Sequence, residues 1–222
     1  MLGRFATDGH EPHPSLTKSN GELSRRAACK ADIVSSLPEV VDCERLVLRR
    51  WKVADAPALS AAIQESLEHL RPWMPWVVYE PLGDEVRAEL IRGWDTAAGD
   101  DGDTVYGAFL DGVVVGGCGL HRRSTPDTLE IGYWIHVDHT RRGYARELSV
   151  ALTSVALALP GIARVEIHHD AANTASRRVP EALGFHLDGE TPDTPAAPAE
   201  IGINVAWSTT PEAWASRPRD LR

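Results

Sequence analysis

The stretch from Leu129 to Leu159 constrains the fold more than any other part of the chain. Apolar and polar residues alternate between Leu129 and Val137, which predicts a strand. Apolar residues then recur at helical spacing, at Leu148, Leu152, Val155 and Leu159. The sequence therefore predicts a strand that leads through a short loop into a helix over residues 145–159, and Pro160-Gly161 ends that helix.

The loop between this strand and this helix is basic and contains a glycine. It reads Arg141-Arg142-Gly143-Tyr144-Ala145 and is followed by Arg146. The first amides of a helix have no carbonyl partners, and the positive end of the helix dipole points outward, so an anion binds well there. Gly143 lets the backbone approach a ligand, Ala145 avoids a clash, and the arginines supply positive charge. The loop suits a diphosphate, although the same residues also fit an ordinary surface turn.

Together with Thr140, the loop resembles the acyl-CoA motif of the GNAT superfamily of N-acetyltransferases. That motif reads Gln or Arg, two residues, Gly, one residue, and Gly or Ala. Thr140 takes the first position here, which leaves Arg141 or Arg142 as the phosphate-binding side chain. Three more segments resemble the RimJ/RimL-type branch, which acetylates ribosomal-protein N-termini, and the resemblance spans residues 44–190. These segments are Glu44–Trp51, Ser66–Trp76, and Asn173–Ser176 with Leu183-Gly184-Phe185.

The resemblance implies a mixed α/β (α+β-like) fold of the GNAT type. In its three layers, helices flank a central mixed, mostly antiparallel sheet of six to seven strands. It also implies acetyl-CoA as the cofactor and direct attack by a primary amine, from a protein or peptide N-terminus or from a small amine. A homodimer is compatible with this branch. The sequence does not identify the acceptor amine.

Other segments fit this architecture from their own patterns. Asp111-Gly112 separates two strand-like runs and is the strongest short signal for a hairpin. Residues 163–169 alternate again after the helix, which predicts a strand parallel to the one before it, with a right-handed crossover. Residues 188–200 predict a proline-rich loop, and residues 201–207 predict a last strand.

Length and composition indicate one domain. With 222 residues, 43% of them hydrophobic, the chain can bury one core, which we place in a single N-acetyltransferase domain over residues 43–222. Residues 1–42 lack a sustained period and predict a flexible extension. The net charge of −9 argues against nucleic acid or anionic membranes as partners and favours an amine-bearing acceptor. No apolar run could span a bilayer, no secretory signal is recognisable, and the three cysteines fit no disulfide framework, so we expect a cytoplasmic protein.

Acetyl transfer to an amine needs a base for the incoming ammonium and donors that polarise the thioester. In the resembling family, the strand before the phosphate loop splays from its parallel neighbour and holds the pantetheine arm. That role is thereby assigned to the backbone of Ile135, His136 and Val137. Glu130 lies on the same strand face as His136 and is the first choice of base. His136 and His121 are rival bases, and each of the three side chains also fits a plain surface position.

Ser176 is the predicted proton donor to the departing thiolate, as the matching position is in the branch that this chain resembles. Asn173 is predicted to hydrogen-bond the pantetheine, and it also fits the N-cap of a short helix. Other branches use a tyrosine several residues past this asparagine, and none stands there in this sequence. Pro180 has no N–H, so it leaves the Ser176 carbonyl without its helical partner and predicts a distorted turn.

Asp55 is predicted to cap an early helix whose buried stripe is Leu59, Ile63, Leu67 and Leu70, and a stiff aromatic segment follows it. Its two prolines flank Trp73-Met74, Trp76 follows the second proline directly, and Tyr79 stands three residues further on. In the resembling family, residues at these positions wall the acceptor pocket. Aromatic side chains at this density equally form ordinary core.

Two other functions stay open from the sequence alone. Cys118, in a run of glycines, could be a thiol nucleophile for acyl transfer, although a strand cysteine is usually a small buried hydrophobe. The chain could also bind CoA as a sensor that has lost the reaction. We expect no metal site at His168-His169-Asp170, because adjacent strand residues point to opposite faces.

Overall fold

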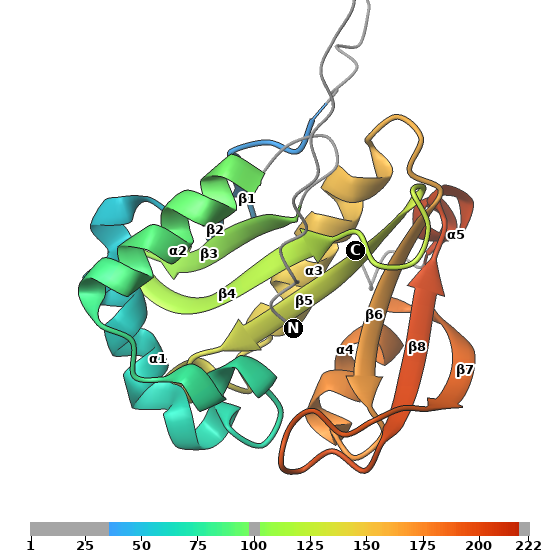
Figure 1. Ribbon diagram of the computed structural model, residues 1–222. Helices are drawn as coiled ribbons and strands as arrows, with labels where there is room; N and C mark the ends of the chain where they lie inside the picture. Colours follow the sequence, from blue (N-terminus) through green and yellow to red (C-terminus); the bar gives the residue numbers. More distant parts are fainter. Residues whose placement is uncertain (1–35, 98–102, 218–222) are drawn as a thin grey trace, which may run out of the picture.

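The computed structural model describes residues 36–97 and 103–217, in which one mixed sheet carries helices on both faces (Figure 1). The strands are β1 (Val40–Asp42), β2 (Val47–Arg50), β3 (Thr104–Leu110), β4 (Val113–His121), β5 (Thr128–Ile135), β6 (Arg164–Asp170), β7 (His186–Pro192) and β8 (Ile203–Thr209). Their spatial order is β1-β2-β3-β4-β5-β6-β8-β7, and every neighbouring pair is antiparallel except β5 and β6.

The helices form the two outer layers. They are α1 (Ala56–Leu70), α2 (Asp84–Ala97), α3 (Tyr144–Leu157), α4 (Thr174–Leu183) and α5 (Pro211–Ser216), with short 3₁₀ turns η1 (Val53–Asp55), η2 (Pro75–Tyr79) and η3 (Val137–His139). Helices α1 and α2 pack on one face against β4 and β3, while α3 and α4 pack on the other face against β5 and β6 (Figure 1). In this part of the chain no helix has the combined length and apolar character that a bilayer crossing requires. The predicted mixed, mostly antiparallel three-layer architecture is confirmed.

Each face of the sheet has its own apolar core. On the α3 side, Leu148 and Leu152 have no exposed surface, as the predicted helical stripe requires. On the α1 side, Leu59 and Ile63 pack against Ile91 of α2. The two cores hold the sheet between the helix pairs. Strands β5 and β6 are interior strands, fifth and sixth in the sheet order.

The turn between β3 and β4 is the hairpin that the sequence predicts. Asp111 and Gly112 have φ values of 48° and 83°, and Leu110 pairs with Val113 across the turn. A two-residue turn of type I′ needs positive φ at both central positions, which Asp-Gly tolerates.

Two edge strands bring the sheet to eight, one more than the largest number predicted. Strand β1 lies inside the predicted extension 1–42, so the sheet begins at Val40 rather than after residue 42, while residues 1–35 lie outside the described part. Strand β7 overlaps the predicted loop 188–200. Its side chains are exposed or half-buried along its whole length, so no apolar alternation marks it in the sequence. Backbone pairing with β8 is what makes it a strand.

Candidate active site

The parallel strands β5 and β6 separate at the centre of the sheet. They pair only from Thr128 to Glu130 on β5 and from Arg164 to Glu166 on β6, although both strands continue further. Beyond Glu130, β5 stays paired with β4, and β6 stays paired with β8, so a gap opens between them (Figure 1). The predicted splay is therefore present in the backbone.

Backbone groups of β5 face this gap at alternate residues. The His136 amide donates to the Val115 carbonyl of β4 at 2.9 Å. Because neighbouring residues of a strand direct their N–H and C=O groups to opposite sides, those of Ile135 and Tyr133 face the gap. The Val137 amide is also occupied, since it donates to Ser66 Oγ of α1 at 3.1 Å. Of the three predicted residues, only Ile135 directs its backbone N–H and C=O groups toward this gap, because β4 and α1 engage the amides of His136 and Val137.

The loop that enters α3 carries amides without protein partners. Arg141 and Gly143 adopt left-handed conformations, with φ values of 58° and 84°, and Gly143 is the N-cap of α3. Among the described residues, the amides of 141–145 donate to no protein acceptor. Five such amides at a helix start, flanked by exposed arginines, fit a diphosphate group.

Thr140, which departs from the family motif, has a local role. Its hydroxyl donates to the Val137 carbonyl at 3.0 Å and so closes the turn η3 just before the loop. Arg141 and Arg142 are exposed, and Tyr144 is buried beneath the loop with 6% of its surface exposed. The charged side chains at the loop surface are therefore those of Arg141 and Arg142, while Tyr144 anchors the loop to the core.

Ser176 lies beside Tyr133, a residue that no motif of the sequence marks. The hydroxyl of Tyr133 on β5 is 3.0 Å from Ser176 Oγ, and it also donates to the Ser176 carbonyl at 3.3 Å. That carbonyl is the one that Pro180 leaves without a helical donor. Helix α4 continues through Pro180, so the helix does not end there, and Tyr133 supplies the donor that the Ser176 carbonyl lacks. Burial, partly opposed by the Ser176 hydrogen bond, raises the pKa of Tyr133 to about 12, so this hydroxyl keeps its proton at neutral pH.

Asn173 caps α4. Its side-chain oxygen accepts the Ser176 amide at 3.0 Å, so Asn173 holds Ser176 at the helix start. Ser176 and Asn173 follow β6, and Tyr133 stands on β5. These three side chains therefore come from both borders of the gap.

The three candidate bases have different surroundings. His136 accepts the Asp138 amide at Nδ1, and its Nε2 lies 2.9 Å from Glu65, so both ring nitrogens are engaged. His121 Nδ1 is 3.0 Å from an Asp103 carboxylate oxygen, close enough for an ion pair but not aligned as a hydrogen bond. Glu130 is half-buried, and its carboxylate has no hydrogen-bond or ion-pair partner within the described ranges.

Glu130 stands next to a second carboxylate. It is paired in register with Glu166 of β6, which is 8% exposed, so both side chains leave the same face of the sheet. Burial alone would raise the pKa of Glu166, but hydrogen bonds from Arg164, His168 and Ser124 lower it below its usual value. Glu166 is therefore an ion with its own partners, and Glu130 is the carboxylate left available at the start of the gap.

The aromatic segment after α1 reaches the sheet through Trp76. Its ring lies edge-on to Trp134 of β5, with 6.4 Å between centroids. The other predicted wall residues differ in exposure, since Trp73 and Met74 are half-buried and Tyr79 is 64% exposed. The segment also meets the loop before β8, where the Ala199 amide donates to the Pro72 carbonyl at 3.0 Å.

Cys118 lies in the core between the sheet and α3, with 4% of its surface exposed. Burial raises the pKa of its thiol far above the usual range, which disfavours the thiolate that a nucleophile requires. In the described part of the chain, no three His, Cys, Asp or Glu side chains are arranged to hold a metal ion.

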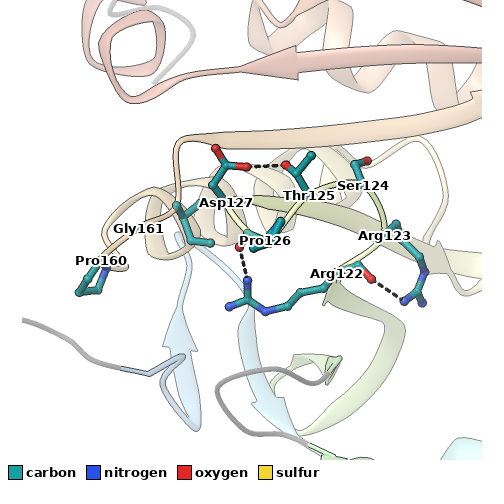
Figure 2. Close-up of a pocket in the computed structure, with 9 residues that line it drawn as sticks. Arg122, Arg123, Ser124, Thr125, Pro126, Asp127, Pro160 and Gly161 are labelled. Carbon is teal, nitrogen blue, oxygen red and sulfur yellow. Dashed lines mark hydrogen bonds between the residues drawn. The ribbon is translucent and has the colours of Figure 1, made fainter. Parts of the chain in front are cut away.

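A separate pocket of about 620 Å³ lies at the other end of β5, between Arg122–Asp127 and Pro160–Ile162 (Figure 2). Both arginine side chains that line it already form hydrogen bonds or ion pairs with other protein groups. The Arg122 guanidinium donates to the Pro126 carbonyl at 2.6 Å, and Arg123 forms a 2.7 Å ion pair with Asp103. None of the predicted site residues lines this pocket.

Comparison with known proteins agrees with this geometry. The chain is 27% identical over 151 residues to the Bacillus subtilis (strain 168) protein named "Putative ribosomal N-acetyltransferase YdaF", covering 68% of this chain and 82% of that one. Its fold matches RimL, a ribosomal L7/L12 alpha-N-protein acetyltransferase in complex with coenzyme A, with a TM-score of 0.72 and 19% identity over 79% of this chain and 99% of that one. It also matches Mycobacterium smegmatis RimJ in complex with CoA-disulfide, with a TM-score of 0.68 and 22% identity over 79% and 88% of the two chains. The model of the acetyltransferase (GNAT) domain matches residues 45–186, and the chain therefore belongs to the GNAT acetyltransferase family.

Proposed function

We propose that this GNAT acetyltransferase moves an acetyl group from acetyl-CoA to the primary amine of a protein or peptide N-terminus, or to a small amine, by direct attack. The observation that carries the proposal is the row of unpartnered amides at 141–145, at the end of the gap between β5 and β6. The names of its relatives, ribosomal N-acetyltransferase and ribosomal-protein acetyltransferase, favour a protein N-terminus as the acceptor.

The residues that would hold acetyl-CoA lie along one line. The loop amides and the side chains of Arg141, Arg142 and Arg146 would bind the diphosphate, and the backbone of Ile135 would bind the pantetheine arm in the gap. When bound, acetyl-CoA supplies the acetyl group as a thioester. The same backbone donors that hold the arm would polarise the thioester carbonyl.

Two side chains accept and donate the protons of the reaction. Glu130 takes a proton from the incoming ammonium, directly or through one water, so that the amine becomes a nucleophile. Ser176, hydrogen-bonded to Tyr133, returns a proton to the departing thiolate. As the C–S bond breaks, the nitrogen of the adduct gives up its second proton, and the hydrogen-bonded hydroxyls of Tyr133 and Ser176 can pass a proton that restores the Ser176 hydroxyl.

The acceptor would enter over the face that carries Trp134. The rings of Trp76 and Trp134 pack edge-on, and Trp73, Met74 and Tyr79 belong to the same segment after α1 as Trp76. Aromatic surfaces of this kind exclude water from the reacting groups and shape the acceptor pocket.

The test is an acetylation screen with purified protein and acetyl-CoA, across peptides with different first residues, polyamines and aminoglycosides. Release of free thiol reports turnover, mass spectrometry identifies the product, and calorimetry reports cofactor binding. Turnover with at least one amine is the expected result. Tight CoA binding without turnover on any amine would instead favour the sensor, and absence of CoA binding would reject both functions.

A matched pair of glycine substitutions checks the site. Gly143→Val forces a β-branched residue into φ 84° in the phosphate loop and should abolish CoA binding. Gly161→Val imposes the same strain at φ 81°, in the loop after α3, where a side chain would meet no atom within 4 Å. CoA binding should survive in that control.

A further inference from the structure

Arg45, just before β2, joins the first part of the chain to the phosphate loop. Its Nη1 donates to the Arg142 carbonyl at 3.1 Å, and its guanidinium stacks over the Tyr144 ring at 4.7 Å from the centroid. Its Nη2 would lie 3.4 Å from a Cβ at Gly143. Two residues of the loop, Arg142 and Tyr144, therefore contact this one side chain, although it stands almost one hundred residues away in the sequence.

The same guanidinium neutralises Glu147 in the first turn of α3. Nε and Nη2 of Arg45 each lie 2.8 Å from Glu147 Oε2. The other oxygen, Oε1, accepts the backbone amides of Arg45 and Leu46 at 2.5 and 2.9 Å. The Glu147 side chain is only 9% exposed, so its charge is weakly screened by solvent.

A carboxylate at this place has two effects on an anionic ligand. It occupies the positive end of the α3 dipole, and it repels a second anion that binds at the same helix end. Arg45 compensates the carboxylate while its remaining donor holds the Arg142 carbonyl. Without Arg45, the buried negative charge of Glu147 would stand uncompensated next to the phosphate site. The loop would also lose the hydrogen bond to the Arg142 carbonyl.

We propose that Arg45 is a positioning residue for the diphosphate of the cofactor. It fixes the loop 142–144 and cancels the Glu147 charge, so that the free amides accept a polyanion. This inference rests on the proposed function, because it requires that the loop binds CoA. It makes no demand on the pantetheine arm, which lies in the gap between β5 and β6.

The experiment compares two ligands that differ by the nucleotide and diphosphate, CoA and pantetheine. Calorimetry with Arg45→Met should show a Kd for CoA raised about tenfold or more, as expected when charge-assisted hydrogen bonds are lost. The Kd for pantetheine should stay within about twofold, since the substitution removes no contact to the gap. The ratio of kcat/KM for acetyl-CoA to that for S-acetylpantetheine should fall by the same factor.

Arg49→Met is a matched control on the same segment. Arg49 also forms a 2.7 Å ion pair, with Asp55, and stacks over a ring, that of Phe109 at 3.9 Å. It has no contact with the phosphate loop among the described residues, so its loss should leave the CoA Kd within about twofold. Adding Glu147→Gln to Arg45→Met removes the repelling charge and should recover most of the affinity for CoA.

Arg45→Lys keeps the charge without the planar fork and should raise the Kd for CoA less than Arg45→Met does. This milder variant gives the answer if Arg45→Met does not fold. If Arg45→Met weakens the binding of CoA and of pantetheine equally, or weakens neither, Arg45 does not position the diphosphate. In that case, CoA binding by the unaltered protein still supports the proposed function. If the unaltered protein binds no CoA, both are rejected together.

Discussion

At the scale of single residues, the two hydroxyl groups of Tyr133 and Ser176 form the most specific contact of the site, 3.0 Å apart across 43 positions of sequence. If Ser176 protonates the thiolate, Ser176→Ala should lower kcat about a hundredfold, with little change in the KM for acetyl-CoA. Tyr133→Phe should lower kcat less, because the serine hydroxyl remains. Initial rates of thiol release measure both variants, and wild-type kcat in both would contradict this proton path.

The same pair marks the limit of sequence reasoning at this scale. Gly143, Asn173 and Ser176 could be singled out because local motifs contain them. Tyr133 falls on the apolar face of the alternating strand Leu129–Val137, and nothing local separates a tyrosine that reaches a helix from one that fills the core. One signal was available: Pro180 leaves the Ser176 carbonyl without a helical donor, and a carbonyl that is withdrawn from solvent needs another one. The occupied amides of His136 and Val137 depend on β4 and α1, which no local pattern reports.

At the scale of elements, Asp170 ties the end of β6 to the segment that enters β8. Its Oδ2 accepts the amides of Ile201, Gly202 and Ile203 at 2.9 to 3.3 Å, and its Oδ1 accepts that of Ala172 at 2.8 Å. Burial would raise the pKa of Asp170, but these hydrogen bonds outweigh it and lower the pKa below its usual value.

A lowered folded-state pKa gives Asp170 a defined pH effect. Its contribution to stability is present above the unfolded pKa of about 4, and it is lost as the pH falls through the lower folded-state pKa. Asp170→Asn should therefore be less stable than the unaltered protein at pH 7, with the difference shrinking at low pH. Urea unfolding between pH 3 and pH 7 measures this, and a difference that is constant over that range would refute it.

The segment that carries Trp76 is held by a buried ion pair between η2 and α2. Arg87 Nη2 lies 2.5 Å from Glu80 Oε1, and the two side chains are 3% and 4% exposed. Arg87→Met leaves the Glu80 charge buried and should cost about 3–5 kcal/mol in the free energy of unfolding. The exposed pair Arg92–Glu89 is the control, and Arg92→Met should cost at most about 1 kcal/mol. Equal costs in urea unfolding would contradict a special role for the buried pair.

Elements with a strong internal period were predictable, and edge elements were not. Helix α3 and the β3–β4 hairpin follow from spacing and turn chemistry, so their limits agree with the sequence to within a few residues. Strands β1 and β7 are at the two edges of the sheet, where few side chains are buried and the neighbouring strand's backbone decides the conformation. Their existence depends on the completed sheet rather than on their own residues.

At the scale of the whole molecule, the sequence predicts a flexible extension before a single domain, and β1 brings the start of the sheet to Val40. Trypsin should therefore cut first at Lys18, Arg25, Arg26 or Lys30 and leave a resistant core that begins before Val40. Mass spectrometry of a limited digest identifies the cut. Early cleavage inside residues 103–217 instead would refute the predicted division. The homodimer and the cytoplasmic location stay predictions.

The three paired positions between β5 and β6 have a mechanical consequence. Within the sheet, backbone pairing at these positions connects the five strands β1 to β5 to the three strands β6, β8 and β7. A long ligand bound between β5 and β6 would contact both groups of strands and hold them together. At a concentration of a hundred times its Kd, CoA would add about 2.7 kcal/mol to the free energy of unfolding. Amide hydrogen exchange should then slow in β5 and β6 together.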